Sequence, residues 1–199
     1  MIEKSRAAQG KVDVSILWKP TREQIAAAEN RKVRDLIAAG LKVLFCGINP
    51  GLYSGAVGHH FARPGNRFWP TLHAAGFTDR LLSPFEEREL LAGGWGITNI
   101  VDRATASAGM LTSEELIAGA RRLERKVRRH RPRVIAFLGI TSYRTAFGKA
   151  DVKLGRQEER LGESDIWILP NPSGLNAHYQ IADLTRLFKE LRLAVRTGG

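Results

Sequence analysis

The chain has 199 residues, and its 43% hydrophobic content is enough to build the core of one compact domain. It carries 31 lysines and arginines against 20 aspartates and glutamates, a formal net charge of +11 that favours a polyanionic partner such as nucleic acid. The single cysteine excludes an intramolecular disulfide and an all-cysteine metal site. Because the sequence shows neither the apolar core of a signal peptide nor a run of membrane length, we expect a cytoplasmic protein without a membrane partner.

The beginning of the chain divides into two parts. Residues 1–20 mix charges with glycine and proline and show no sustained period, which predicts a basic, poorly ordered arm. Residues 21–199 are expected to form a single domain. Its first element is predicted to be a helix over 21–39, where apolar residues recur at roughly helical spacing and Gly40 supplies a stop.

Four short apolar runs have the length of buried strands: 43–46, 97–101, 134–138 and 166–169. Helical patterns lie between them, and the clearest covers 112–130, where Thr112 and Glu115 form a possible capping box and Pro132 follows the end. Near-continuous apolar strands that alternate with helices indicate a parallel sheet covered on both faces. The sequence therefore predicts an α/β fold, a three-layer αβα sandwich with a short, mainly parallel central sheet.

Two loops that follow predicted strands resemble each other. The chain reads GINPGL at 47–52, after the first strand, and PNPSGL at 170–175, after the last. Proline fixes the backbone, glycine permits close approach, and asparagine offers a donor and an acceptor without charge. Ordinary turns use the same residues, but ligands of parallel sheets bind at the carboxyl ends of strands. Two such loops at equivalent strand ends favour one binding site.

The segment HHFARPGNRFW at 59–69 mixes cations, amides and aromatic residues where a loop is expected. Phe61 could stack on an unstacked base, as aromatic side chains do when proteins hold an extruded nucleotide. Phe68 and Trp69 begin the helical run 66–75, so we expect them in the core.

Signals for a metal or a cofactor are missing from the sequence. His59 and His60 have no carboxylate at ligand spacing beside them. Gly148 and Lys149 lack both the preceding glycine and the following serine or threonine of a phosphate-binding loop. We therefore expect neither a metal ion nor a cofactor.

These motifs resemble the mismatch-specific uracil-DNA glycosylases, bacterial relatives of thymine-DNA glycosylase. The resemblance rests on GINPG (47–51), FARPGNRFW (61–69), AGFTD (75–79), VDR (101–103) and NPSGL (171–175), in the family's order and spacing, and covers about residues 41–195. It implies the uracil-DNA glycosylase fold, with a base pocket at the strand ends. It also implies a DNA repair enzyme that flips uracil from a mispaired duplex and hydrolyses the N-glycosidic bond, leaving an abasic site. Thymine, ethenocytosine and hypoxanthine stay open as further substrates.

The resemblance also assigns roles to residues. It gives water positioning to Asn49, base stacking to Phe61, and duplex penetration to the loop from Asn171 to Leu175, while backbone groups near Ile48 and Phe61 line the polar edge of the base. Where the family is expected to carry an arginine after this loop, the chain reads Asn176-Ala177-His178. The resulting substrate-binding residues are Ile48, Phe61 and Asn171, and the DNA contacts are Ser173, Gly174, Leu175, Asn176 and His178.

The chemistry of the predicted site depends on Asn49, whose amide cannot accept a proton at neutral pH. We therefore expect a slower enzyme than relatives that carry aspartate in this motif. Asp102 follows the second apolar run and could reach the same rim to help activate water, giving two catalytic candidates, Asn49 and Asp102. A salt bridge to Arg103, or a helix cap, is the structural alternative for Asp102.

Two other functions are compatible with the composition. A non-catalytic nucleic-acid-binding module would use the same basic surface, although lysine and arginine alone would then suffice and the paired Asn-Pro loops would have no purpose. A nucleosidase for free nucleosides would use the same bond chemistry, but the charge of +11 favours a polymer. We expect a monomeric, monofunctional glycosylase that acts on DNA without an imine intermediate, because no motif lysine is evident.

Overall fold

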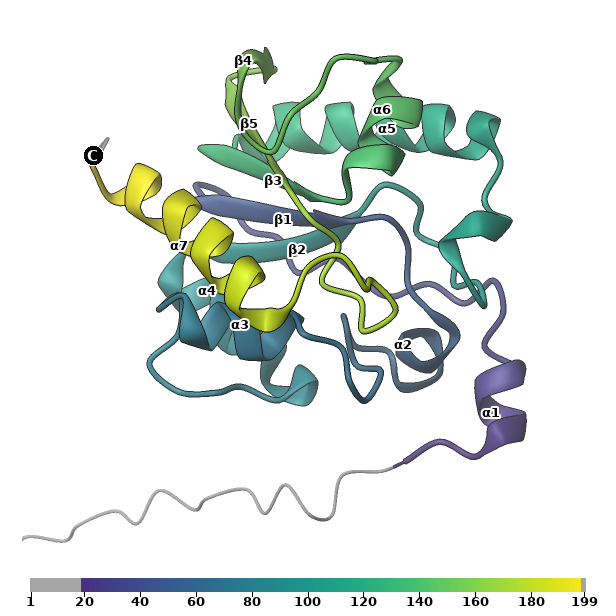
Figure 1. The fold of residues 1–199 in the computed structure, drawn as a ribbon. Coiled ribbons are helices and arrows are strands. Elements are labelled where there is room, and N and C mark those ends of the chain that lie inside the picture. The colour runs from purple at the N-terminus through teal and green to yellow at the C-terminus, as the bar shows by residue number, and fades with distance from the viewer. Residues whose placement is uncertain (1–18, 198–199) are drawn as a thin grey trace, which may run out of the picture.

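A five-stranded sheet forms the centre of the computed structural model, which describes residues 19–197 (Figure 1). The strands are β1 (Val43–Gly47), β2 (Trp95–Asn99), β3 (Val134–Leu138), β4 (Gly155–Leu161) and β5 (Ser164–Leu169). They lie in the order β2-β1-β3-β5-β4, and every neighbouring pair is parallel except β4 with β5. The predicted short, mainly parallel sheet is confirmed.

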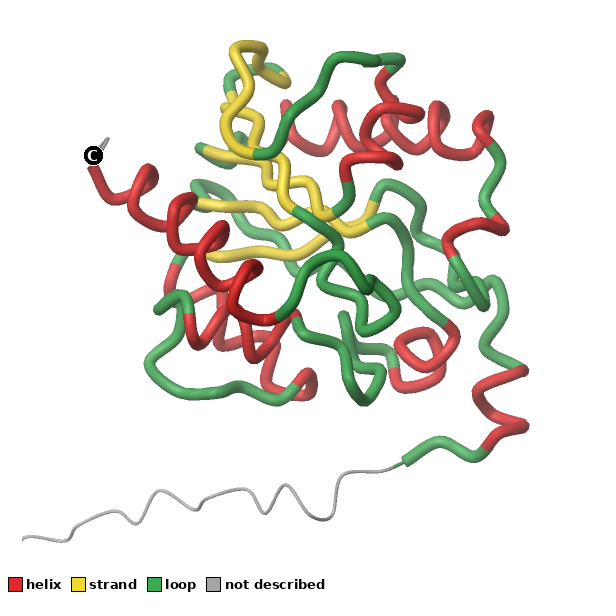
Figure 2. Tube along the Cα trace, viewed as in Figure 1, coloured by secondary structure: helices red, strands yellow, loops and turns green. Residues whose placement is uncertain are grey.

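Helices cover both faces of this sheet (Figures 1 and 2). One face packs against α3 (Phe68–Ala74), α4 (Leu90–Gly93) and α7 (Ile181–Thr197), and the other against α5 (Ser113–His130) and α6 (Ile140–Phe147). Shorter elements occupy the connections: α1 (Arg22–Ala26), α2 (Leu52–Val57), and the 3-10 helices η2 (Pro84–Glu89) and η3 (Ala108–Met110). The predicted three-layer sandwich is therefore confirmed.

Alternation along β1 shows why both faces need a helical layer. Phe45 belongs to the core beneath α3 and α7, whereas Leu44 and Cys46 belong to the core beneath α5 and α6. Phe45 is fully buried, with its ring edge-on to Phe68 at 5.6 Å and stacked on Phe188 at 5.9 Å. Truncating such a ring typically costs about 3–5 kcal/mol of stability.

Helix α5 begins as its sequence predicts. Thr112 is the N-cap, its hydroxyl accepts the Glu115 N–H at 3.2 Å, and the Glu115 carboxylate accepts the Thr112 N–H at 3.0 Å. The helix ends at His130, where Arg131 adopts a left-handed conformation with φ of 47° before Pro132. The predicted capping box and helix are both confirmed.

The predicted helix over 21–39 is wrong beyond its first turn and a half. Helix α1 stops at Ala26, and Asn30 has a φ of 63° that a helix cannot contain. Beyond it, Leu36 exchanges two backbone hydrogen bonds of 2.9 and 2.8 Å with Ile97 of β2. The apolar spacing that suggested a helix instead serves an extended segment beside the sheet, because pairing with β2 outweighs local propensity.

Two strand predictions also need correction. The second strand runs over Trp95–Asn99 rather than 97–101, so Ile100 and Val101 are buried just beyond its end. Strand β4 was not predicted because its sequence, GRQEERL, lies at the sheet edge with mostly exposed or half-buried side chains and therefore has no apolar run.

Residues 1–18 of the predicted basic arm lie outside the described part of the chain. Within residues 19–197, no helix combines the length and the apolar content that crossing a membrane requires.

Candidate active site at the strand ends

The two Asn-Pro loops meet at one cavity. It has a volume of about 370 Å³ and lies beyond the carboxyl ends of β1 and β5. Four loop segments and the end of β3 supply its lining, which consists of Gly47, Ile48, Asn49, Gly51, Phe61, Arg63, Thr105, Ala106, Ser107, Ala108, Leu138, Asn171, Ser173, Leu175 and Asn176. The cavity is therefore placed where ligands of parallel sheets bind.

The amide of Asn49 is held by acceptors from the segment that follows β2. Its Nδ2 donates hydrogen bonds to Thr105 Oγ1 at 2.7 Å and to the Arg103 carbonyl at 3.0 Å, and lies 3.2 Å from the Pro50 carbonyl. The Thr105 hydroxyl donates to the Ser107 carbonyl at 2.7 Å, which leaves its oxygen free to accept from Asn49. Since every one of these partners needs a donor, the network fixes which end of the Asn49 amide is nitrogen.

The opposite end of the same amide is unengaged. Within residues 19–197, Asn49 Oδ1 has no hydrogen-bond partner, and Asn49 is half-buried in the cavity wall. A fixed carbonyl oxygen beside a cavity can accept a hydrogen bond from water and orient it without taking its proton.

Phe61 and Asn99 converge on Gly47 at the floor of the cavity. A Cβ at Gly47 would lie 2.5 Å from Asn99 Oδ1 and 3.2 Å from Phe61 Cζ, so only glycine fits at the end of β1. The Phe61 ring stacks on Phe68 with centroids 4.1 Å apart and planes inclined by 28°. One face of the Phe61 ring is thus supported by the core, and the residue lines the cavity.

Polar contacts of the neighbouring residues fix the backbone at Phe61. Phe61 has a φ of 52°, a conformation that is unfavourable for a residue with a side chain. Immediately before it, the His60 N–H donates to Glu87 Oε2 at 2.9 Å, and His59 Nδ1 lies 3.0 Å from Glu87 Oε1. The neighbouring Ala62 N–H donates to Ser54 Oγ at 3.0 Å. These bonds hold the backbone on both sides of Phe61.

Burial fixes the charge state of His60. Its Nε2–H donates to the Arg34 carbonyl at 3.0 Å, so Nδ1 is left as the acceptor that faces Asn99 Nδ2 at 3.5 Å. Desolvation lowers the pKa of His60 below its usual value, and the attraction of Glu87 and the hydrogen bond to Arg34 only partly offset this effect. The neutral imidazole is therefore the stable form.

Arg67 fixes the loop that follows β5 through hydrogen bonds to its backbone carbonyls. The Arg67 guanidinium donates to the carbonyls of Ser173 and Tyr179 and, at 2.8 Å, to that of Asn176. The backbone N–H of Arg67 donates to the Pro172 carbonyl at 3.0 Å. One side chain thus connects the segment after the first Asn-Pro loop to several points of the second.

Local bonds shape the same loop further. Asn171 Oδ1 accepts the Ser173 N–H at 3.0 Å, and Asn176 Nδ2 donates to the Asn171 carbonyl at 3.0 Å. Gly174 packs against Gly65, and a Cβ added at Gly174 would lie 2.6 Å from the Gly65 carbonyl oxygen. The following Leu175 is 73% exposed, so a rigid loop presents an apolar side chain to solvent.

Residues 35–192 match the model of the Uracil DNA glycosylase superfamily, which is far more than half of the chain. The chain belongs to this superfamily. It is a DNA glycosylase, a hydrolase of N-glycosidic bonds in DNA. Among solved structures, it is similar to the solution NMR structure of a Methanosarcina acetivorans protein provisionally described as a uracil DNA glycosylase. The identity is 17%, the match covers 82% of this chain and 98% of the other, and the TM-score of 0.52 supports the shared fold.

Most residues predicted for the site of this glycosylase lie at the cavity. Asn49, Ile48, Phe61, Asn171, Ser173, Leu175 and Asn176 line it, and Gly174 connects two of them. His178 is exposed and lines a neighbouring hollow of about 360 Å³ with Ile48, Asn171 and Asn176. These positions are structural findings, and the catalytic and binding roles stay predictions.

Asp102 is not brought to this cavity. Its carboxylate pairs with Lys32 at 2.9 Å, and it does not line the cavity of the glycosylase. Burial raises the pKa of Asp102, but the hydrogen bond and the charge of Lys32 more than offset this, so that the net shift is downward. A carboxylate held ionised in this way is a weak base. Its predicted role in activating water has no support from this placement.

Three residues of the site were not assigned a role from sequence. Thr105 and Asn99 contact Asn49 and Gly47 only because parallel strands place their carboxyl ends side by side. Their sequence positions could have suggested a role, because Asn99 lies within the second apolar run and Thr105 follows it by four residues. Arg67 lies within the FARPGNRFW motif, but its hydrogen-bond partners are backbone carbonyls more than 100 residues away in the sequence. A local motif gives no information about such contacts.

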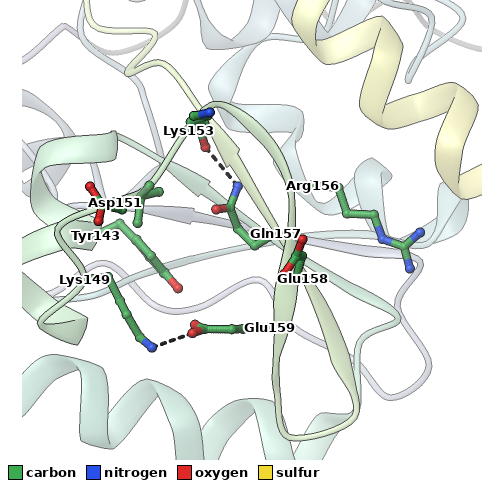
Figure 3. A pocket seen from close by; sticks show the side chains of 9 residues that line it. Tyr143, Lys149, Asp151, Lys153, Arg156, Gln157, Glu158 and Glu159 are labelled. Atoms are coloured by element: carbon green, nitrogen blue, oxygen red, sulfur yellow. Dashed lines mark hydrogen bonds and ion pairs between the residues drawn. The ribbon is translucent and has the colours of Figure 1, made fainter.

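A second cleft of the glycosylase, of about 300 Å³, lies between α6 and β4 (Figure 3). Its side chains carry both signs of charge, and Lys149 pairs with Glu159 at 2.6 Å. Tyr143 extends into its wall, and burial raises the pKa of this phenol to about 12. Charged side chains dominate this cleft, and its amide side chain, Gln157, is already bonded through Nε2 to the Lys153 and Gly155 carbonyls at 2.9 Å, so the cleft differs from the cavity at Asn49.

Proposed function

We propose that this glycosylase excises uracil, and related damaged pyrimidines, from mispaired duplex DNA, using a water molecule held by Asn49. The observation that carries the proposal is the orientation of the Asn49 amide, whose nitrogen is bound by Thr105 and Arg103 while its oxygen stays unengaged beside the cavity. This arrangement suits a neutral group that orients an attacking water.

The cavity has the features of a site for a planar base. Its volume of about 370 Å³ falls within the usual range for small-ligand sites. Phe61 offers a ring whose other face already rests on Phe68. Within the described residues the Phe61 N–H has no hydrogen-bond partner, and Asn171 keeps its amide nitrogen unused, so both are donors available to the carbonyl oxygens of uracil.

The charge distribution agrees with cleavage driven by stabilisation of the leaving base. The reaction builds negative charge on the departing uracil and positive charge on the sugar. Arg63 is the one ionisable side chain among the cavity-lining residues of the described chain, so no carboxylate or imidazole there can act as a strong base. We therefore expect slow hydrolysis that relies on fixed donors and on the flanking phosphates.

The proposed product is an abasic site on an intact strand. No lysine lines the cavity within the described residues, so an imine with the sugar has no evident nucleophile. In those residues there is also no group of three or more histidine, cysteine, aspartate or glutamate side chains that could hold a metal ion. Hydrolysis by an oriented water accounts for the chemistry with the residues at hand.

The loop at Leu175 supports the proposed action on mispaired duplexes. An extruded base leaves a gap in the stack, and an exposed apolar side chain on a rigid loop can fill it. Extrusion costs less when the base is poorly paired, so a glycosylase with modest catalytic power gains most from mismatches.

The proposal is tested with labelled duplexes that carry one uracil opposite guanine or adenine, and with the matching single strand. We expect abasic sites most rapidly in the uracil:guanine duplex, with no loss in EDTA and no adduct trapped by borohydride. Binding without cleavage would instead indicate a non-catalytic module, and hydrolysis of free deoxyuridine would indicate a nucleosidase. Activity that EDTA abolishes and a divalent ion restores would contradict the proposed mechanism.

A further inference from the structure

The outer face of the second half of α5 carries a stripe of five arginines. Arg121, Arg122, Arg125, Arg128 and Arg129 are all exposed. At about 100° per residue they fall within an arc of roughly 120°. The buried residues of the helix, among them Leu123 and Val127, lie on the opposite side and pack beneath it.

Most of this charge has no ion-pair or hydrogen-bond partner among the described residues. Arg128 pairs with Glu124 at 2.8 Å. The side chains of Arg121, Arg125 and Arg129 form no ion pair or hydrogen bond within residues 19–197. These three are spaced i, i+4, i+8, so each faces a like charge one turn away, which destabilises a helix by about 0.2–0.5 kcal/mol for each pair.

The helix dipole explains only part of the pattern. Cations in the last turn of a helix are favourable, and this accounts for Arg129 beside the end at His130. The effect fades within one turn, so it does not account for Arg121 and Arg125. The phosphates of a polyanion bound along the outer face would attract both arginines and so offset their mutual repulsion.

The arginine stripe and the cavity lie on different parts of the protein surface. Helix α5 starts just after Ala108, which lines the cavity, and runs antiparallel to the strands over roughly 27 Å. At its far end the His130 carbonyl accepts the Gly40 N–H at 3.4 Å, and the Arg133 N–H donates to the Leu41 carbonyl at 2.8 Å, just before the amino end of β1. Figure 1 shows α5 on the sheet face opposite α3 and α7.

We propose that the arginine stripe of α5 is a second DNA-binding surface, which holds the sugar-phosphate backbone of a DNA segment other than the one whose base enters the cavity. Guanidinium groups bind phosphates through paired hydrogen bonds, and their contacts release counterions from DNA. Contacts to phosphate and sugar carry no sequence information, so we expect this surface to bind DNA without sequence preference.

Two DNA-binding surfaces on one molecule change how the enzyme moves between DNA segments in search of its substrate. A glycosylase that holds one segment at the cavity and a second at α5 passes directly from one to the other, without a free state between them. Its dissociation from a labelled duplex then accelerates as unlabelled duplex is added. A protein with one surface dissociates at a rate that does not depend on the competitor.

The test compares two triple variants that each remove three positive charges. The first is Arg121→Gln, Arg125→Gln and Arg129→Gln in α5. The control is Arg88→Gln, Lys189→Gln and Arg196→Gln, exposed positions on η2 and α7. Glutamine is a good helix former, and thermal melting checks that both variants fold.

Three measurements on uracil-free and uracil-containing duplexes decide the matter. For the α5 variant on long uracil-free duplex, we expect the slope of log affinity against log salt to become smaller in magnitude by about 2 to 3. Each lost phosphate contact contributes roughly 0.9 to this slope. We also expect its dissociation to lose its dependence on competitor DNA, while single-turnover excision from a short duplex stays unchanged. The control should keep the competitor dependence of the wild type.

Two results would overturn the inference. If the α5 variant and the control have the same salt slope and the same competitor dependence, the stripe is only a solvated face. If short-duplex excision falls in proportion to binding, the stripe belongs to the footprint around the cavity. Both binding measurements use DNA without uracil, so they stand whatever base the enzyme excises.

Discussion

The Asn49 amide nitrogen donates a hydrogen bond of 2.7 Å to the hydroxyl oxygen of Thr105, and this bond joins the first Asn-Pro loop to the segment after β2. Because the nitrogen is committed to Thr105, the oxygen of the same amide is left beside the cavity. Thr105 is buried, so the bond is shielded from water. We infer that Thr105 acts by positioning Asn49 through this bond.

Replacing Thr105 tests this positioning role. Thr105→Val removes the acceptor and lets the Asn49 amide turn, so we expect single-turnover excision to fall about tenfold, as loss of a hydrogen bond worth roughly 1.4 kcal/mol would give. Thr105→Ser keeps the hydroxyl and should stay close to wild type, while DNA binding is unchanged in both. A valine variant that cleaves at the wild-type rate would remove Thr105 from the mechanism.

The clamp formed by Arg67 predicts a difference between duplex and single-stranded substrates. Arg67→Ala frees the carbonyls of Ser173 and Asn176, so the loop loses its fixed shape. We expect at least a tenfold loss of excision from uracil:guanine duplex, equivalent to a lost charge-assisted hydrogen bond of about 1.5–3 kcal/mol, and little loss on a single strand. Arg80→Ala, at a distant surface ion pair, is the matched control. Equal loss on both substrates together with a lower melting temperature would make Arg67 a packing residue.

Leu175 is expected to act on the duplex and not on the fold. Its side chain is 73% exposed, so Leu175→Ala should leave the melting temperature unchanged. Excision from duplex should fall more than excision from a single strand, because the alanine cannot fill the gap left by the extruded base. Leu175→Met keeps the apolar volume and should retain most activity. A lower melting temperature with uniform loss of activity would argue for packing.

Much of the fold could be predicted from sequence, and the reason is visible in β1. Its five residues are all buried, so an apolar run identifies the strand, and GINPG marks where it ends. Strand β4 and the segment around Leu36 could not be predicted, because the first has no apolar run and the second is extended only by pairing with Ile97. Local pattern therefore predicted the interior of the sheet better than its edges.

The candidate site divides in the same way. Asn49, Phe61 and Leu175 were predicted from motifs, and the structure places all three at one cavity. The contact of Asn49 with Thr105 depends on two strands lying side by side, which no local pattern encodes. Asp102 follows a strand end as predicted, but its carboxylate pairs with Lys32, from the segment wrongly assigned to a helix, and does not line the cavity.

The buried His60 predicts how stability depends on pH. Its pKa is lowered in the folded state, so the unfolded chain binds more protons as the pH falls through the usual histidine value of about 6.5. Stability from this group is complete above that value and is lost below it. We expect the melting temperature to fall between about pH 7.5 and pH 5.5. His60→Gln should flatten this dependence, and the exposed His178→Gln should not. An unchanged slope in His60→Gln would place the titration elsewhere.

The most direct test of the account is Asn49→Ala, measured for melting, DNA binding and single-turnover cleavage on one uracil:guanine duplex. Losing a preorganised polar group in a catalytic site typically costs about 2.7–4 kcal/mol, so we expect cleavage to fall roughly a hundred- to a thousandfold. Melting and binding should stay near wild type, because phosphate contacts are spread over arginine and lysine side chains. A folded Asn49→Ala protein that cleaves at nearly the wild-type rate would contradict the central claim that Asn49 holds the attacking water.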